Sequence, residues 1–194
     1  SLALGSSSIS LLELTNAYAV FANMGTRIEP VFITKITDKA GNILEETSTT
    51  IETVLTPQTA YIMTNLLAGV IQDGTGQRAK ALGRPAAGKT GTTNDLNDAW
   101  FIGFTPNLIA GSWMGYDDER PLGHMETGAR AALPIWLKFM QKALEGTYVK
   151  DFQIPEGVMF TRIDRATGMP ATPATEKAIF EAFKEGTAPI EDVN

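Results

Sequence analysis

Cysteine is absent from this 194-residue chain, and histidine occurs once. The lack of cysteine excludes disulfides, thiolate metal sites and a cysteine nucleophile, and it leaves the cellular compartment open. No stretch approaches the ~20 apolar residues that a membrane-spanning helix needs. No signal peptide is visible, and the chain starts with Ser1 rather than an initiator Met. We therefore expect the numbering to begin inside a longer protein.

Basic residues are also scarce: 16 Lys and Arg face 22 Asp and Glu, which gives a net charge of -6. An acidic surface argues against nucleic acids and anionic membranes as main partners. With 43% hydrophobic and 20% charged residues, the chain can form one substantial domain and does not have a disordered composition. The single histidine, His124, lies in a polar loop without a second ligand, so we expect neither a metal nor a cofactor.

Three segments carry helix signals. In residues 10–25, Ser10 and Glu13 have the spacing of a capping box. Residues 56–74 begin with a threonine cap and a proline at the first helical position, and they end in glycine. Residues 131–146 have an apolar stripe that predicts an amphipathic helix, formed by Ile135, Trp136, Phe139, Met140 and Ala143.

Strand signals lie between and after these helices. Residues 29–47 predict a β-hairpin around the turn at 38–42. The strongest signal is a pair of aromatic and β-branched runs, Ala99–Thr105 and Leu108–Tyr116, on either side of a Pro-Asn turn. The elements together predict an α+β fold, in which an antiparallel sheet is flanked by helices.

The last part of the chain, residues 147–194, differs in character because proline is frequent there. We expect one short strand at Val158–Ile163 and one short helix at Glu176–Lys184. This part is interpreted as a C-terminal extension that packs on or beside the domain formed by residues 1–146.

The stretch GRPAAGKTGTTND, residues 83–95, satisfies two motifs at once. It matches the phosphate-binding pattern G-x-x-x-x-G-K-[ST]. It also contains Lys89-Thr90-Gly91-Thr92, the K-T-G motif of serine enzymes that process D-alanyl peptides and β-lactams. A P-loop joins a buried strand to a helix. The preceding residues 77–82 contain two cations, and residues 91–95 are poor helix formers, so both flanks disfavour a nucleotide site.

The K-T-G interpretation places this stretch on a strand that borders a groove and is followed by two more antiparallel strands. Thr90 and Thr92 can donate hydroxyl protons to a substrate carboxylate, and Lys89 supplies a positive charge that attracts the anion and assists proton transfer. Gly91 lets a ligand backbone come close, and the Thr92 N–H is a candidate oxyanion donor. Strict alternation puts Lys89 on the opposite face from the two threonines, so its stem must reach round the strand or the strand must twist.

Several segments around the K-T-G motif carry a further resemblance. AAGKTGTTND and DAWFIGFTP, with GSWMGYDD downstream and SLALGSSSISLLELTNAYAVFANMG and TPQTAYIMTNLLAGVIQDGTG upstream, resemble the class A, bifunctional penicillin-binding proteins. The resemblance covers roughly residues 1–145 and, more loosely, FEAFKEGTAPI. It implies that residues 1–146 are the C-terminal portion of a transpeptidase domain, with an incomplete penicillin-binding/β-lactamase-like fold. Lys89, Thr90, Gly91 and Thr92 would then form the substrate-binding wall, with Lys89 also catalytic.

The resemblance implies that the protein cross-links peptidoglycan stem peptides through a serine acyl-enzyme. It also implies that β-lactams acylate the same serine. The family works outside the cytoplasmic membrane and is tethered by an upstream anchor. Its nucleophile belongs to an S-x-x-K motif and a second S-x-N motif lines the groove, but neither occurs in this chain.

We therefore expect a companion N-terminal segment with both motifs, and no activity from this chain alone. A β-lactamase or D,D-carboxypeptidase relative, or a non-catalytic peptide-binding or structural fragment, remain alternatives. A companion chain that carries S-x-x-K would discriminate between the enzyme and the non-catalytic fragment.

Overall fold

The computed structural model describes residues 8–118 and 120–190. Helices and strands follow one another in the order α1 (Leu11–Ala22), β1 (Thr26–Ile28), β2 (Lys35–Thr37), β3 (Ile43–Glu46), β4 (Ile51–Thr53), α2 (Pro57–Gln72), η2 (Gln77–Leu82), β5 (Ala87–Thr92), β6 (Asp98–Phe104), β7 (Ile109–Gly115), η3 (Gly128–Ala132), α3 (Leu133–Ala143), β8 (Val158–Asp164) and β9 (Ala178–Lys184). Here η2 is a 3₁₀ helix and η3 is one turn of π-helix.

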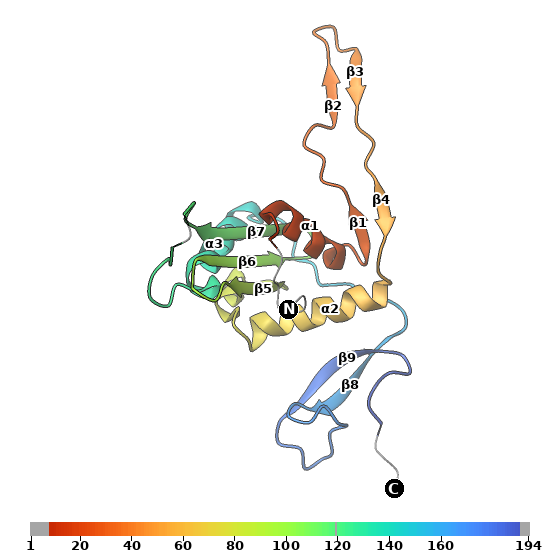
Figure 1. Ribbon diagram of the computed structural model, residues 1–194. Coiled ribbons are helices and arrows are strands. Elements are labelled where there is room, and N and C mark those ends of the chain that lie inside the picture. The colour runs from red at the N-terminus through yellow and green to blue at the C-terminus, as the bar shows by residue number, and fades with distance from the viewer. Residues whose placement is uncertain (1–7, 119, 191–194) are drawn as a thin grey trace.

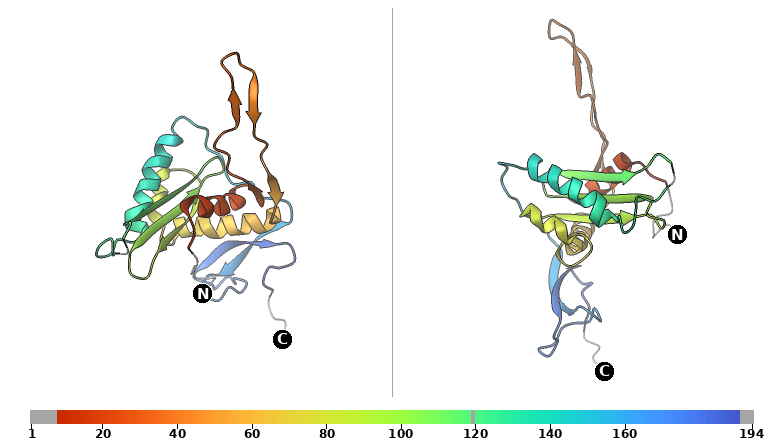
Figure 2. Two further views of the ribbon diagram at one scale, coloured as in Figure 1. Left: turned by 45° about the horizontal axis from the view of Figure 1, so that its top comes forward. Right: turned by 90° about the vertical axis from the view of Figure 1, so that its left-hand side faces the viewer.

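The centre of the fold is an antiparallel sheet with the strand order β5-β6-β7. Helix α3 covers one face of this sheet, and α1 and α2 lie on the other side (Figures 1 and 2). This is the α+β arrangement, an antiparallel sheet flanked by helices, that the sequence predicts. β5 is an outer strand of the sheet as far as the described residues go, so one of its edges is not paired with another strand.

Aromatic residues of β6 fill the core on both faces of the sheet. Phe101 and Phe104 are fully buried; Phe101 points to α3, where its ring centre lies 4.9 Å from that of Trp136. The indole N–H of Trp136 donates to the Gly103 carbonyl at 2.9 Å, so this large buried side chain leaves no polar atom unpaired. These contacts fix α3 against the centre of the sheet.

The N-terminal ends of the first two helices agree with the sequence signals. Ser10 and Glu13 form the capping box of α1, and Thr56 caps α2 with Pro57 in its first turn. The predicted stripe of α3 is only partly right. Trp136 and Met140 are buried, whereas Ile135, Phe139 and Ala143 are exposed; the buried side of the segment also contains Leu133 and Leu144.

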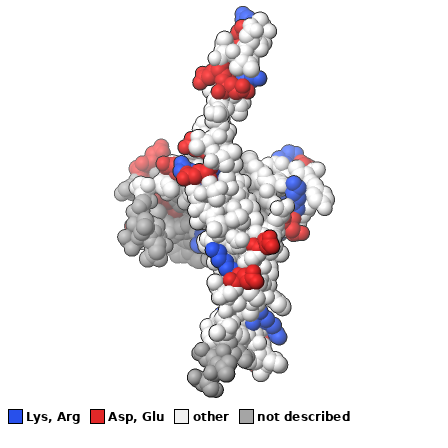
Figure 3. Space-filling model, turned by 90° about the vertical axis from the view of Figure 1, so that its right-hand side faces the viewer, with Lys and Arg blue, Asp and Glu red and all other residues white. Residues whose placement is uncertain are grey.

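A long two-stranded ribbon projects from the body between α1 and α2 (Figure 1). Its outer part is the predicted hairpin, β2 paired with β3 around the turn at 38–42. Its base is a second pairing, β1 with β4, which the sequence analysis did not predict. On the face shown in Figure 3, acidic side chains are interspersed with basic ones along the ribbon and the body.

The C-terminal part forms a hairpin of β8 and β9 that packs against α2. Tyr61 and Phe160 meet edge to face with ring centres 6.3 Å apart, and the Asn65 side chain donates to the Glu181 carboxylate at 2.7 Å. The predicted strand at Val158–Ile163 is confirmed, but the predicted helix at Glu176–Lys184 is wrong. Ala178–Lys184 is the strand β9, because pairing with β8 outweighs the local preference of its Glu, Lys and Ala residues for a helix.

No helix among the described residues has the length and apolar character required to cross a bilayer. The same residues contain no cluster of three or more His, Asp or Glu side chains arranged to hold a metal ion.

Candidate functional site

Lys89, Thr90, Gly91 and Thr92 are consecutive residues of β5. β5 runs antiparallel to β6, with Lys89 opposite Ile102 and Thr92 opposite Ala99. The element before it is the 3₁₀ helix η2 and the element after it is another strand. Neither flank has the strand-to-helix context of a P-loop, so the predicted strand placement of the motif is confirmed.

The backbone groups of the two threonines point to the unpaired edge of β5. The N–H of Thr93 donates to the Asp98 carbonyl of the neighbouring strand at 3.1 Å. Because backbone groups alternate in direction along an antiparallel strand, Lys89 and Gly91 also bond towards β6. The N–H groups of Thr90 and Thr92 therefore face outward, where a ligand in extended conformation would add to the sheet.

Lys89 reaches this edge with its long side chain. By strand alternation the lysine leaves the sheet on the face opposite the two threonines. Its Nζ nevertheless donates to the Thr90 carbonyl at 2.9 Å, and the side chain is exposed. The stem thus bends round the strand, the first of the two solutions that the sequence left open, and the ammonium lies beside the outward-facing backbone.

Each threonine hydroxyl has a partner from another part of the chain. The Oγ1 atoms of Thr75 and Thr90 are 2.7 Å apart, and Thr75 lies in the loop between α2 and η2. The Thr92 Oγ1 accepts a hydrogen bond of 3.0 Å from the backbone N–H of Gly128, at the start of η3. No motif in the sequence indicates a role for Thr75 or Gly128. Their contacts join residues 15 and 36 positions apart, which local patterns do not reveal.

Gly128 fits so closely behind β5 that no side chain has room there. A Cβ atom on this buried residue would lie closer than 3.0 Å to the carbonyl oxygens of both Gly91 and Trp100. The absence of a Cβ lets η3 lie directly against the strand pair and bring its N–H to Thr92. This close packing depends on Gly128 having no side chain, and it lies on the face of the sheet that carries the Thr92 hydroxyl.

The serines that the structure describes near the sheet or at a helix end are engaged elsewhere. Ser112 is buried on the α3 side, and its hydroxyl donates to the Ala132 carbonyl at 2.9 Å. The Ser10 hydroxyl donates to the Glu13 carboxylate at 2.6 Å in the cap of α1. His124 is exposed in the loop before η3. None of the three is joined to the Lys89–Thr92 edge by a hydrogen bond.

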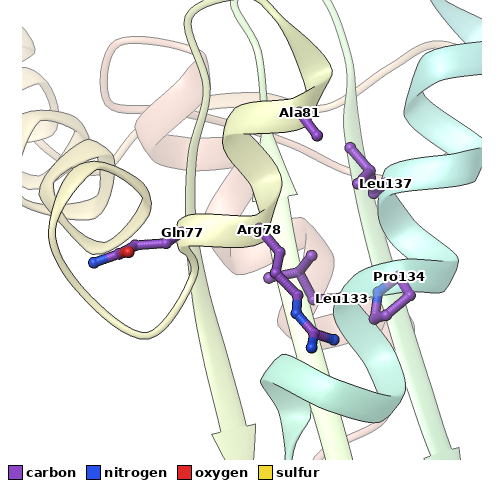
Figure 4. A pocket seen from close by; sticks show the side chains of 6 residues that line it. All are labelled: Gln77, Arg78, Ala81, Leu133, Pro134 and Leu137. Carbon is purple, nitrogen blue, oxygen red and sulfur yellow. The ribbon is translucent and has the colours of Figure 1, made fainter.

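One apolar cavity of the body lies away from this edge. It measures about 470 Å³ and opens between η2 and α3, where the Arg78 side chain extends towards the start of α3 (Figure 4). Its lining contains no residue of β5 and consists of Gln77, Arg78, Ala81, Leu133, Pro134 and Leu137.

The same sequence matches a known family over most of the length described above. The model of the penicillin binding protein transpeptidase domain matches residues 1–118. This chain belongs to the penicillin-binding protein transpeptidase family. The resemblance drawn from the residues around the K-T-G motif is thereby confirmed.

Relatives in the penicillin-binding family extend the match to the C-terminal hairpin. Penicillin-binding protein 1A of Aquifex aeolicus is 45% identical over 155 residues, which is 80% of this chain and 21% of that protein. Penicillin-binding protein 1A of Rickettsia bellii is 39% identical over 207 residues, covering 95% of this chain and 26% of that protein. The chain thus spans about a fifth to a quarter of these two relatives.

A solved structure of the family has the same fold. The crystal structure of penicillin-binding protein 1A from Haemophilus influenzae superposes with a TM-score of 0.89 at 30% identity, covering 97% of this chain and 34% of that one. The transpeptidase-like fold predicted from the sequence is therefore confirmed, and it includes the arrangement of the sheet, its helices and the C-terminal hairpin.

Proposed function

We propose that this chain supplies one wall of the active site of a peptidoglycan D,D-transpeptidase. The observation that carries the proposal is the outer edge of β5, where two outward-facing backbone N–H groups, two threonine hydroxyls and one ammonium lie within four residues. Membership of the penicillin-binding transpeptidase family supports the reaction class.

In this proposal the wall binds the carboxylate-bearing end of a stem peptide or a β-lactam. The substrate backbone lies along β5 as an added strand. Thr90 and Thr92 donate their hydroxyl protons to the carboxylate, and the Lys89 ammonium attracts the same anion. The Thr92 N–H stabilises the negative charge that develops on the carbonyl oxygen under attack.

The nucleophile would come from a companion N-terminal segment with the S-x-x-K and S-x-N motifs, which residues 1–194 lack. The serine oxygen attacks the peptide or lactam carbonyl and passes its proton to a neighbouring base. The C–N bond breaks, and the leaving nitrogen takes up a proton as the acyl-enzyme forms. An amine of a second stem peptide then displaces the serine, which completes the cross-link. No metal or cofactor takes part in these steps, and this chain alone is inactive.

We also propose that residues 1–146 are the C-terminal portion of the transpeptidase domain and that residues 147–194 form an extension beside it. The contacts of β8 and β9 with α2 support this division. The compartment that fits the substrate is the outer side of the cytoplasmic membrane, with the tether upstream of this chain.

The test uses the full-length protein that contains this chain, and it measures the rate of acylation by a fluorescent penicillin. Lys89→Ala should slow acylation by more than about ten-fold, because bonds to charged groups are worth roughly 1.5–3 kcal/mol. The matched control is Lys138→Ala, which removes an exposed lysine of α3 and should leave the rate unchanged. Equal acylation rates for the wild type, Lys89→Ala and Lys138→Ala would refute the proposal that Lys89 belongs to a substrate-binding wall.

The products separate transpeptidation from simple hydrolysis. With a donor stem peptide and an amine acceptor, a transpeptidase yields the cross-linked peptide and releases D-alanine. A carboxypeptidase or β-lactamase relative would release D-alanine or opened lactam without the cross-link.

A further inference from the structure

We infer that Thr75 is a positioning residue that directs the hydroxyl proton of Thr90 into the substrate groove. The inference rests on the proposed function, because it concerns the use of Thr90 in carboxylate binding. It adds a residue outside the K-T-G motif, from the loop between α2 and η2.

The loop holds Thr75 in one place. The N–H groups of Gly74 and Gly76 both donate to the Val70 carbonyl at the end of α2, at 3.1 and 3.0 Å. A Cβ on Gly74 would fall 2.9 Å from Val70 atoms, so only glycine fits that turn. Gly76 is buried and its carbonyl accepts the first backbone bond into η2. Thr75 is therefore fixed from both sides, and its hydroxyl lies 2.7 Å from that of Thr90.

The hydrogen-bonding capacity of a hydroxyl group gives this contact a direction. A threonine hydroxyl has one proton to donate and two lone pairs to accept with. A carboxylate can only accept. If Thr90 gives its one proton to a substrate carboxylate, then the bond between the two threonines must have Thr75 as donor and Thr90 as acceptor. With the ligand bound, Thr75 therefore donates to a lone pair of Thr90, and the single proton of Thr90 goes to the ligand.

Thr92 is held in the same manner. Its Oγ1 accepts from the Gly128 N–H, a donor that cannot reverse its direction, so its own proton also stays available. When a carboxylate is bound and Thr75 is the donor to Thr90, both hydroxyls of the wall accept from the protein and donate to the groove. At Thr90 the donor is a side chain, which makes this half of the arrangement accessible to substitution.

The experiment measures the second-order rate constant for acylation of the full-length protein by a carboxylate-bearing penicillin and by its methyl ester. The variants are Thr75→Val, Thr75→Ser, Thr90→Val and the double variant, with Thr49→Val in the exposed ribbon as the matched control. Thr75→Val should slow acylation by the free acid about three-fold, less than the roughly ten-fold loss for Thr90→Val, in line with the net worth of one hydrogen bond. Thr75→Ser should retain the wild-type rate.

Two further rate constants distinguish a positioning role of Thr75 from a merely structural one; the positioning role predicts the following results. In the Thr90→Val background, Thr75→Val should have no further effect, because the group it positions is gone. With the methyl ester, which has no carboxylate to bind, Thr75→Val should match the wild type. An additive loss in the double variant, an equal loss with the ester, a serine variant as slow as the valine variant, or no loss at all would each overturn the inference.

The outcome also separates this inference from the proposed function. If the wild-type full-length protein is not acylated, or if Lys89→Ala is acylated at the wild-type rate, the proposed function fails and this inference fails with it. If the Lys89→Ala loss is present but Thr75→Val behaves like the Thr49→Val control, only the role of Thr75 is refuted.

Discussion

Gly128→Ala should destabilise the protein and weaken the wall in the same step. The new methyl group would lie closer than 3.0 Å to the carbonyl oxygens of Gly91 and Trp100, and backbone atoms in a paired sheet cannot move aside freely. η3 must then shift away from β5, which breaks the hydrogen bond from Gly128 to the Thr92 hydroxyl. Overpacking of this kind costs about 1–3 kcal/mol, and the lost hydrogen bond about 0.5–1.5 kcal/mol.

The expected decrease in the free energy of unfolding is therefore about 1.5–4.5 kcal/mol, measured by denaturant unfolding of the domain that contains this chain. The same variant should be acylated more slowly by penicillin. Gly69→Ala is the matched control: an added Cβ meets no atom beyond its own helix within 4 Å, and alanine is favoured over glycine inside α2 by about 0.5–1 kcal/mol. If Gly128→Ala were as stable as Gly69→Ala, the close packing of η3 on β5 would be refuted.

Three further predictions concern the core, the nucleotide motif and pH. Trp136→Ala should lower the free energy of unfolding by about 3–5 kcal/mol, because this side chain is 1% exposed and bonded to Gly103; a loss below 1 kcal/mol in denaturant unfolding would contradict the packing. Calorimetric titration with magnesium nucleotides should be silent; micromolar binding abolished by Lys89→Ala would revive the P-loop. The hydrogen bonds from Ser10 lower the pKa of Glu13 from its ordinary value of 4.5, so their contribution to stability is present above that value and is lost as the pH falls through the lowered pKa. Ser10→Ala should flatten this part of the stability–pH curve, and an unchanged curve would count against the cap.

Local signals in the sequence were sufficient to predict those structural features that depend on residues close together in the chain. The N-terminal caps of α1 and α2 and the turn between β6 and β7 are all set within a few positions. The K-T-G motif could be placed on a strand because its flanks lacked the features of a P-loop. The family resemblance then supplied the expectation of a transpeptidase fold.

Features that depend on tertiary contacts could not be predicted in this way. β9 has helix-forming residues, but β8 is beside it and pairs with all seven of its residues. The apolar residues Ile135 and Phe139 of α3 are exposed because the sheet contacts only the side of the helix with Trp136 and Met140. Thr75 contacts Thr90 only when the loop between α2 and η2 is folded. No local sequence pattern near either residue therefore predicts the contact.

We propose that Lys89–Thr92 form a substrate-binding wall and that the nucleophile lies in a companion N-terminal segment. The direct test is to label the full-length protein with a fluorescent penicillin and map the labelled peptide. We predict one labelled serine, in an S-x-x-K motif outside this chain, and strongly reduced labelling of that serine in Lys89→Ala. A labelled serine within this chain, at Ser10 or Ser112 for example, or undiminished labelling without Lys89, would contradict it.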